Sequence, residues 1–182
     1  MLNVNEKIKK LVITALMAAL TCVMTLVVQI PMPLGGYVNL GDGVILLLSA
    51  VILGPLYGAL AGAIGACLAD IISGFAIYAP GTFVIKALIA VVAFYVYKAI
   101  DKHIKNTSIT FVAKLVAGVL GEIVMVAGYF VYDATVMGYG LAAASGLVGN
   151  SIQGVIAVVV FVALGEVITR NKALKKFIYE IK

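Results

Sequence analysis

Charged residues are scarce in this chain. Only 12% of its 182 residues are Asp, Glu, Lys or Arg, whereas 64% are hydrophobic, and the mean hydropathy is +1.18. A water-soluble domain of this length cannot bury so large an apolar fraction, because its surface is too large relative to its volume. The composition therefore predicts an all-α integral membrane protein. No soluble module, linker or repeat interrupts the sequence, so we expect a single transmembrane domain over residues 1–182.

Signals of catalysis and of metal binding are also lacking. The sequence contains no G-x-x-x-x-G-K-[ST] phosphate loop and no H-E-x-x-H motif, and Cys22 and Cys67 both lie in apolar runs. We therefore expect no nucleotide hydrolysis by this chain, no metal site and no enzyme activity. The net charge of +5 comes from basic residues beside apolar runs, a pattern that indicates membrane orientation and not nucleic-acid binding.

Apolar runs account for most of the chain. The run at 11–28 is longer than the core of a signal peptide and no A-x-A-like cleavage site follows it, so we expect it to remain as a helix. The segment 38–73 is interrupted by Gly54 and Pro55, which allows either one kinked helix or a helical hairpin. The other long runs are Thr82–Ala99, Ile109–Val131 and Leu141–Ile168.

The basic residues decide between these two topologies. They cluster at 7–10, at 98–114 and in the tail 169–182, and positive charge favours the cytoplasmic side of short loops. A helical hairpin places twelve of the 13 basic residues in the cytoplasm, with Lys86 as the exception. The prediction is a membrane protein with both termini cytoplasmic and six transmembrane helices, at about 10–29, 37–53, 56–73, 80–99, 109–131 and 141–168.

Several polar side chains fall inside these spans, where such groups usually face the interior of a bundle. Glu122, Tyr129 and Asp133 recur on one face of the fifth helix, at spacings of seven and four residues. Asn150 and Gln153, three residues apart, share a face of the sixth. These two polar faces predict a binding site inside the bundle.

Lys86 lies inside the fourth span, where an ammonium group costs about 2.5–3.5 kcal/mol at a helix centre. It is retained either as a donor to a ligand or as the partner of a buried acid, with Glu122 and Asp70 as the candidates. Asp42 either caps the second helix or contributes to the site. Asp70 and Asp133 lie near enough to the outer surface for water to solvate them.

Four motifs follow one another between Gly36 and Ala90: N-L-G-D, G-P-x-Y-G, A-D and A-P-x-T-F-x-x-K. In this order they resemble the substrate-binding S components of energy-coupling factor (ECF) vitamin transporters. The resemblance is to the riboflavin-type group that includes proposed hydroxymethylpyrimidine and pyridoxine carriers. It extends to G-E-I-V-M-V-A-G-Y-F-V-Y-D and G-N-S-I-Q-G later in the chain, so that it covers nearly the whole sequence.

The resemblance implies a six-helix bundle in a bacterial plasma membrane that binds a vitamin from outside, beneath its first outer loop. A membrane T subunit and two ATPase subunits would complete the importer and use the ATP, so this chain would need no cofactor. Pyridoxine or hydroxymethylpyrimidine is favoured as the ligand, and riboflavin is next. A stand-alone permease and, with less support, a membrane enzyme are the alternatives from other functional classes.

The resemblance also assigns residues to the predicted contacts. Ala15 and Ala19 match an A-x-x-x-A pattern on the first helix of the family, which implies a contact with the T subunit; Ala18 would serve an interior face equally well. The predicted substrate-binding residues are Asn39, Asp42, Asp70, Tyr78, Thr82, Lys86, Glu122, Tyr129, Asn150 and Gln153.

Overall fold

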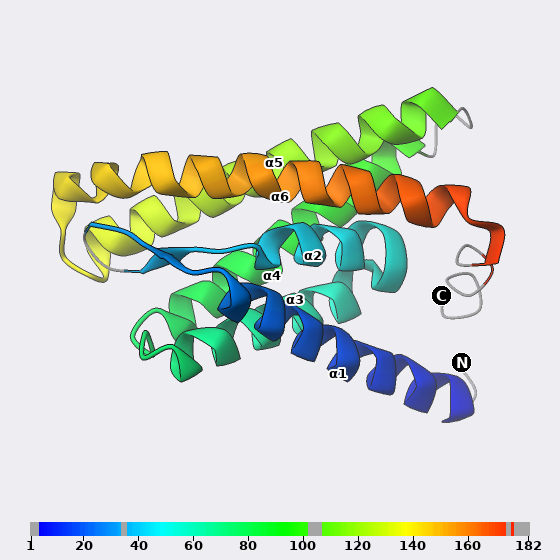
Figure 1. Cartoon of the computed structure of the whole chain (residues 1–182), viewed down its shortest axis with the longest axis horizontal. Coiled ribbons are helices and arrows are strands. Elements are labelled where there is room, and N and C mark those ends of the chain that lie inside the picture. Colours follow the sequence, from blue (N-terminus) through cyan, green and yellow to red (C-terminus); the bar gives the residue numbers. More distant parts are fainter. Residues whose placement is uncertain (1–3, 34–35, 102–106, 174–175, 177–182) are drawn as a thin grey trace.

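The structure, a computed structural model, describes residues 4–33, 36–101, 107–173 and 176. Long helices lie side by side and a short two-stranded hairpin joins the first of them to the second (Figure 1). The elements are α1 (Val4–Val27), β1 (Ile30–Pro31), β2 (Tyr37–Val38), α2 (Gly41–Leu47), the π-helical turn η1 (Leu48–Leu53), α3 (Gly54–Ile72), α4 (Ala79–Asp101), α5 (Thr107–Thr135), the 3-10 helix η2 (Gly140–Ser145) and α6 (Gly146–Arg170).

Five helical segments among the described residues are long and apolar enough to cross a membrane. Most large apolar side chains on their outer faces are exposed, which is the pattern expected where lipid covers the protein. The segments are Lys7–Val27, Gly41–Ile72, Ala79–Asp101, Thr110–Thr135 and Gly140–Ile168.

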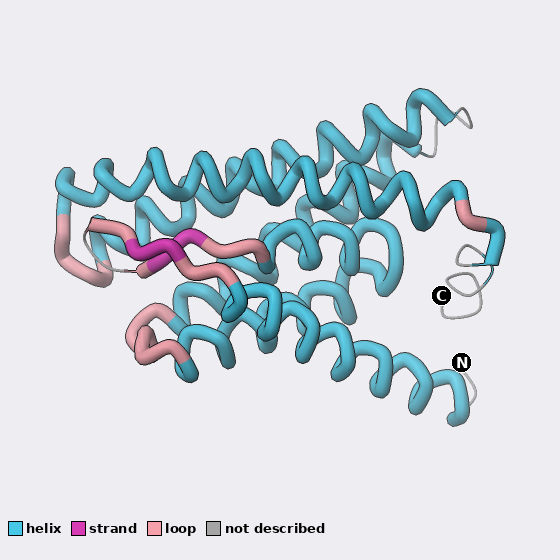
Figure 2. The backbone as a smooth tube through the Cα atoms, viewed as in Figure 1, coloured by secondary structure: helices cyan, strands magenta, loops and turns pink. Residues whose placement is uncertain are grey.

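The second of these segments reverses direction at Gly54. Gly54 has a φ of +79°, in the left-handed region that glycine adopts without strain, and Pro55 follows it in the first turn of α3. A Cβ atom on Gly62 would lie 2.8 Å from Ile45, so α3 runs back along α2. The helical hairpin expected from the sequence is therefore present (Figure 2).

The first helix of this helical hairpin, formed by α2 and η1, is shorter than predicted. We expected a helix from 37 to 53, but Tyr37 and Val38 pair with β1 and α2 begins only at Gly41. The 13 helical residues of α2 and η1 span about 20 Å, less than the roughly 30 Å of a hydrocarbon core. A sixth complete crossing and the side on which the termini lie therefore stay predictions.

Helix α2 lies in the middle of the bundle. Ile45 and Leu46 of α2 are fully buried against Ile89 of α4, Met125 of α5 and Phe161 of α6. Glycines allow this close approach: a Cβ atom on Gly43 would lie 2.8 Å from Val160, and one on Gly121 would lie 2.9 Å from Leu46. The central position of α2 brings Asp42, in its first turn, into the interior.

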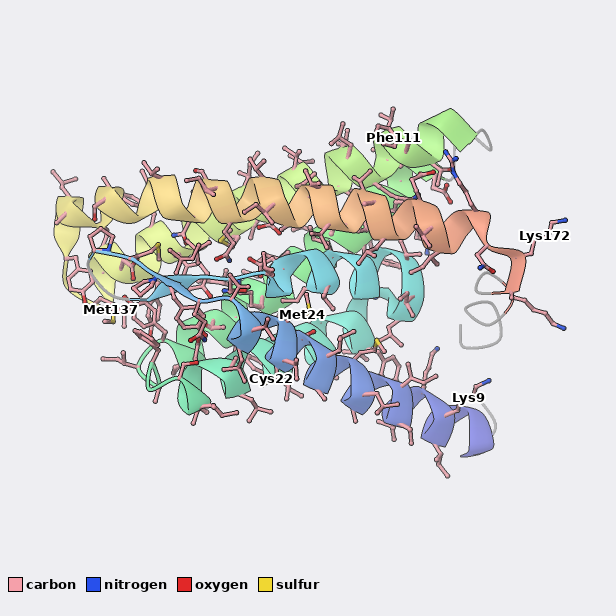
Figure 3. The ribbon with its side chains drawn as sticks, viewed as in Figure 1. Lys9, Cys22, Met24, Phe111, Met137 and Lys172 are labelled. Carbon is pink, nitrogen blue, oxygen red and sulfur yellow. The ribbon has the colours of Figure 1, made fainter. Side chains whose placement is uncertain are left out.

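Helix α1 begins and α6 ends at the same end of the molecule. Figure 3 places Lys9 and Lys172 at this terminal end and Met137 at the opposite end. The loops that join α3 to α4 and α5 to α6 lie at that opposite end (Figure 2). We call it the hairpin end, after the β1–β2 hairpin and not after the helical hairpin of α2 and α3. Of the basic residues counted in the topology argument, Lys102, Lys105, Lys175 and Lys182 lie outside the described residues.

Lys114 is buried, although its position beside the basic cluster predicted a charge at the membrane surface. It is 0% exposed and its Nζ lies 2.6 Å from Oε1 of Glu166, which also accepts a hydrogen bond from Arg170 at 2.9 Å. The pairing is between α5 and α6, so it joins the two helices near the terminal end.

Candidate functional site

A small polar cavity lies beneath the β1–β2 hairpin. Its volume is about 30 Å³, which is roughly the share of liquid volume of one water molecule. Seven of the ten predicted binding residues line it: Asn39, Asp70, Tyr78, Thr82, Tyr129, Asn150 and Gln153. The wall is completed by residues that were not predicted to bind: Met32, Gly36, Tyr37, Phe75 and Asp133.

A chain of buried hydrogen bonds runs from the hairpin to the centre of the bundle. The backbone N–H of Asn39 donates to Oε1 of Gln153 at 2.7 Å, and Nε2 of Gln153 donates to Oδ2 of Asp42 at 2.5 Å. The other oxygen of Asp42 accepts from Nζ of Lys86 at 2.5 Å. Each group is compensated, as buried charged and polar groups require.

Asp42 does not cap α2. The side chain of Asn39 accepts a hydrogen bond from the N–H of Gly41 at 2.9 Å, so Asn39 supplies the local contact at the start of the helix. A Cβ atom on Gly41 would overlap Oγ1 of Thr25 in α1, so a residue with a side chain would force α1 and α2 apart. The capping interpretation is replaced by an ion pair between Asp42 and Lys86.

Lys86 pairs with neither of the two acids considered from the sequence. Its Nζ binds Asp42 and lies 5.1 Å from the centre of the Tyr129 ring, close enough for a cation–π interaction. The Tyr129 hydroxyl lies 3.0 Å from that of Thr82. Tyr129 and Thr82 line the cavity whereas Lys86 and Asp42 do not, so the ion pair lies behind the wall.

The β1–β2 hairpin is fastened to the end of α3 and to the loop that follows it. The Tyr37 hydroxyl donates to Oδ1 of Asp70 at 2.6 Å, and Nε2 of Gln29 donates to Oγ of Ser73 at 2.6 Å. Burial raises the pKa of Tyr37, and the hydrogen bond to Asp70 raises it further, so the phenol stays protonated as a donor. The Tyr37 ring lies 5.1 Å from that of Phe75.

Three polar groups in the cavity wall have no hydrogen-bond partner among the described residues. They are Oδ2 of Asp70, Oδ1 of Asp133 and the hydroxyl of Tyr78, and all three side chains are buried. Buried polar atoms are rarely left unpaired in native proteins, so these three mark positions where a bound molecule can form hydrogen bonds.

Glu122 lies apart from the cavity. Both of its carboxylate oxygens lack a hydrogen-bond partner among the described residues, and its side chain packs against Gly154 of α6. It faces a mostly apolar hollow of about 660 Å³ between α5 and α6. Among the described residues, no group of three or more His, Cys, Asp or Glu side chains is placed to hold a metal ion.

The predicted contact face on α1 points outward. Ala15 and Ala19 are exposed, whereas Ala18 is 8% exposed and packs in the core with Thr14 and Thr21. At about 100° per residue, Ala15 and Ala19 lie on a face next to that of Ala18, and the close approach of Gly65 to Ala18 and Cys22 fixes the inner side of the helix. A second helix can therefore reach Ala15 and Ala19 without disturbing the bundle.

The residues missed by the sequence argument are mainly aromatic or apolar. Tyr37, Phe75 and Met32 lie in or beside loops, where neither helical spacing nor an isolated charge marks them. Asp133 was recognised on the polar face of the fifth helix but was interpreted as solvated; in the structure it is 6% exposed.

Comparison with known proteins identifies the family. Residues 5–170 match the family described as ECF-type riboflavin transporter, S component. A Pyrococcus woesei protein that carries the name "Uncharacterized protein in gap 3'region" is 34% identical over 150 residues, which are 82% of this chain and 94% of that protein.

A solved structure shares the fold. The S component of a bacterial ECF transporter superposes with a TM-score of 0.64 at 19% sequence identity, over 90% of this chain and 97% of that one. The resemblance stated from the sequence motifs is confirmed. This chain belongs to the family of S components of ECF-type riboflavin transporters, whose members are transporter subunits and not a family of enzymes.

Proposed function

We propose that this chain captures a small B-vitamin or vitamin precursor at the outer face of the cell membrane. The observation that carries the proposal is the polar cavity beneath the hairpin, whose wall contains three buried groups without partners. Family membership supports a substrate-binding subunit of an ECF transporter. The hairpin end is then the outer end, and both termini are cytoplasmic after six crossings.

The β1–β2 hairpin covers the binding site. At about 30 Å³ the cavity is smaller than any vitamin, so entry requires the hairpin to move away from α3 and α6. Besides the packing of Tyr37 and Val38, three side-chain hydrogen bonds hold it: Tyr37 to Asp70, Gln29 to Ser73, and the Asn39 N–H to Gln153. Such a small set of hydrogen bonds allows opening at modest cost.

The size and chemistry of the cavity favour a small ring. Pyridoxine or hydroxymethylpyrimidine requires less displacement of the hairpin than riboflavin does. Their hydroxyl groups and ring nitrogens suit the carboxylate, amide and phenol groups of Asp70, Asn150 and Tyr78. Riboflavin is the next candidate, because the family is named for it.

Energy for uptake comes from partner subunits in this proposal. A T subunit contacts the exposed face of α1 at Ala15 and Ala19, and two ATPase subunits hydrolyse ATP. The small side chains on this face support the contact, since they let the backbone of another helix approach closely in lipid.

Equilibrium binding to the purified protein tests the proposal. Labelled pyridoxine, hydroxymethylpyrimidine and riboflavin are each titrated into the protein in lipid nanodiscs, and the bound molecule is recovered and analysed by mass spectrometry. The proposal predicts saturable one-to-one binding of at least one of them, recovered unchanged. Recovery of a converted product would indicate a membrane enzyme instead, and no binding of any of the three would contradict the proposal.

A further inference from the structure

We propose that the cavity takes a ring ligand that is cationic or rich in hydrogen-bond donors, and that it excludes analogues carrying a carboxylate or phosphate. This inference rests on the proposed function, because it concerns the same cavity. Two observations carry it. Acidic oxygens in the wall lack partners, and none of the described residues that line the wall is basic.

Two carboxylates present free acceptors to the cavity from different helices. Oδ2 of Asp70 in α3 and Oδ1 of Asp133 in α5 have no hydrogen bond of good geometry among the described residues, although the hydroxyl groups of Thr82 and Tyr78 are their neighbours, and each residue is only 6% exposed. A buried carboxylate oxygen without a hydrogen bond is destabilised, so a ligand that brings an N–H or O–H donor to it is bound more tightly. A positively charged donor gains more than a neutral one.

Lys86, which lies behind the ring of Tyr129 with its Nζ 5.1 Å from the ring centre, does not contribute a hydrogen-bonding group to the wall. Its ammonium group is bound to Asp42, and neither side chain lines the cavity. An anionic ligand would therefore lie beside Asp70 and Asp133 with no basic side chain in the wall to pair with, because the nearest ammonium group is already bound to Asp42. Repulsion between like charges is strong where water is excluded, so carboxylated or phosphorylated analogues are disfavoured.

The rest of the wall suits a flat heteroaromatic ring. Tyr37 and Phe75 supply aromatic rings, against which a cationic ring stacks favourably; the ring of Tyr129 already carries the ammonium group of Lys86. Asn150 and Gln153 can donate to ring nitrogens or hydroxyl groups through their amides, although Gln153 already holds Asp42.

A series of three compounds on one ring tests the inference. Pyridoxamine, pyridoxine and 4-pyridoxic acid carry an ammonium, a hydroxyl and a carboxylate at the same position. Their affinities for the purified protein are measured by equilibrium dialysis at neutral pH. We expect pyridoxamine or pyridoxine to bind at least about tenfold more tightly than 4-pyridoxic acid.

Matched variants assign the preference to the two carboxylates. Asp70→Asn and Asp133→Asn should each reduce the preference for the amine over the acid by about tenfold. Asp101→Asn, which removes the same charge from the far end of α4, should leave the preference unchanged. A melting curve for each variant separates lost selectivity from lost folding. Should Asp70→Asn fail to fold because a neutral amide oxygen accepts more weakly from Tyr37 than a carboxylate does, the Asp133→Asn variant still tests the inference.

Three results would overturn the inference. The first is equal or tighter binding of 4-pyridoxic acid, and the second is an unchanged preference in a folded Asp133→Asn variant. The third is failure of all three pyridines to bind while riboflavin, a neutral vitamin, binds tightly; the proposed function would then stand without this selectivity. Failure of every vitamin to bind would contradict the proposed function as well.

Discussion

Lys86 reaches from α4 to Asp42 in α2, and both side chains are almost completely buried. A lone buried charge is far more costly than a buried pair, because its desolvation is not repaid. Gln153 binds the same carboxylate and also the N–H of Asn39 in the hairpin. The ion pair therefore supports both the packing of α2 and the position of the cover over the site.

Lys86→Met should destabilise the protein by about 3–5 kcal/mol, because it leaves Asp42 buried without a cation. Vitamin binding should weaken by about tenfold or more, since Gln153 and the hairpin lose a fixed partner. Lys98→Met, an exposed position on the same helix, is the matched control. Thermal unfolding and equilibrium binding measure the two effects.

The double variant Asp42→Asn with Lys86→Met separates stability from binding. It removes both charges, so most of the stability lost in Lys86→Met should return. If the double variant is no more stable than Lys86→Met, the ion pair is not the reason for the buried lysine. If Lys86→Met binds its vitamin normally, the lysine is a structural partner only.

Much of the site could be predicted because a polar side chain in an apolar span is conspicuous. Asp70, Tyr129, Asn150 and Gln153 stood out for this reason, and all four line the cavity. The pairing of Lys86 could not be predicted, since several acids were within reach of the fourth span and their distances depend on where α2 lies. Tyr37 and Phe75 gave no comparable signal, because neither is placed by helical spacing beside another polar residue and both residue types are common in membrane proteins.

At the scale of elements, the sequence allowed us to predict the change of chain direction at Gly54 but not the residue at which α2 begins. Glycine followed by proline ends a helix for steric reasons that act locally. The strand formed by Tyr37 and Val38 depends on its pairing with Ile30 and Pro31, a contact that hydropathy does not encode. An apolar stretch beside a short strand therefore looked like the first turn of a helix.

One side of helix α1 faces the bundle and another faces its surroundings. Replacing alanines on the two sides should therefore have different effects on binding and on uptake. Replacing Ala15 and Ala19 together by leucine should leave vitamin binding by the isolated protein intact, because both positions are exposed. Uptake should be abolished in cells that also contain the T subunit and the ATPases, since bulky side chains prevent close helix approach.

Ala18→Leu provides the contrasting case on the same helix. Ala18 is buried beside Gly65, so a larger side chain there should lower the melting temperature of the isolated protein. Loss of vitamin binding in the Ala15 and Ala19 variant would place that face inside the bundle. Unimpaired uptake by the same variant would place the docking surface elsewhere.

At the scale of the whole molecule, the topology predicts which ends are accessible from each side of the membrane. Single cysteines at Ala76 and Thr135, both exposed at the hairpin end, should react with an impermeant thiol reagent in intact cells, with Cys22 and Cys67 replaced. A cysteine at Lys172, at the terminal end, should react only after the membrane is opened. Labelling of Lys172→Cys but not of Ala76→Cys in intact cells would reverse the orientation.

The central claim is that this chain binds a vitamin for an importer powered by other subunits. Uptake of labelled pyridoxine, hydroxymethylpyrimidine and riboflavin is measured in cells that express this chain with or without the T subunit and the two ATPases. We predict accumulation of the vitamin that the purified protein binds, only when all the subunits are present, and its loss when ATP hydrolysis by the ATPases is abolished. Equal accumulation with this chain alone would contradict the account and indicate a stand-alone permease.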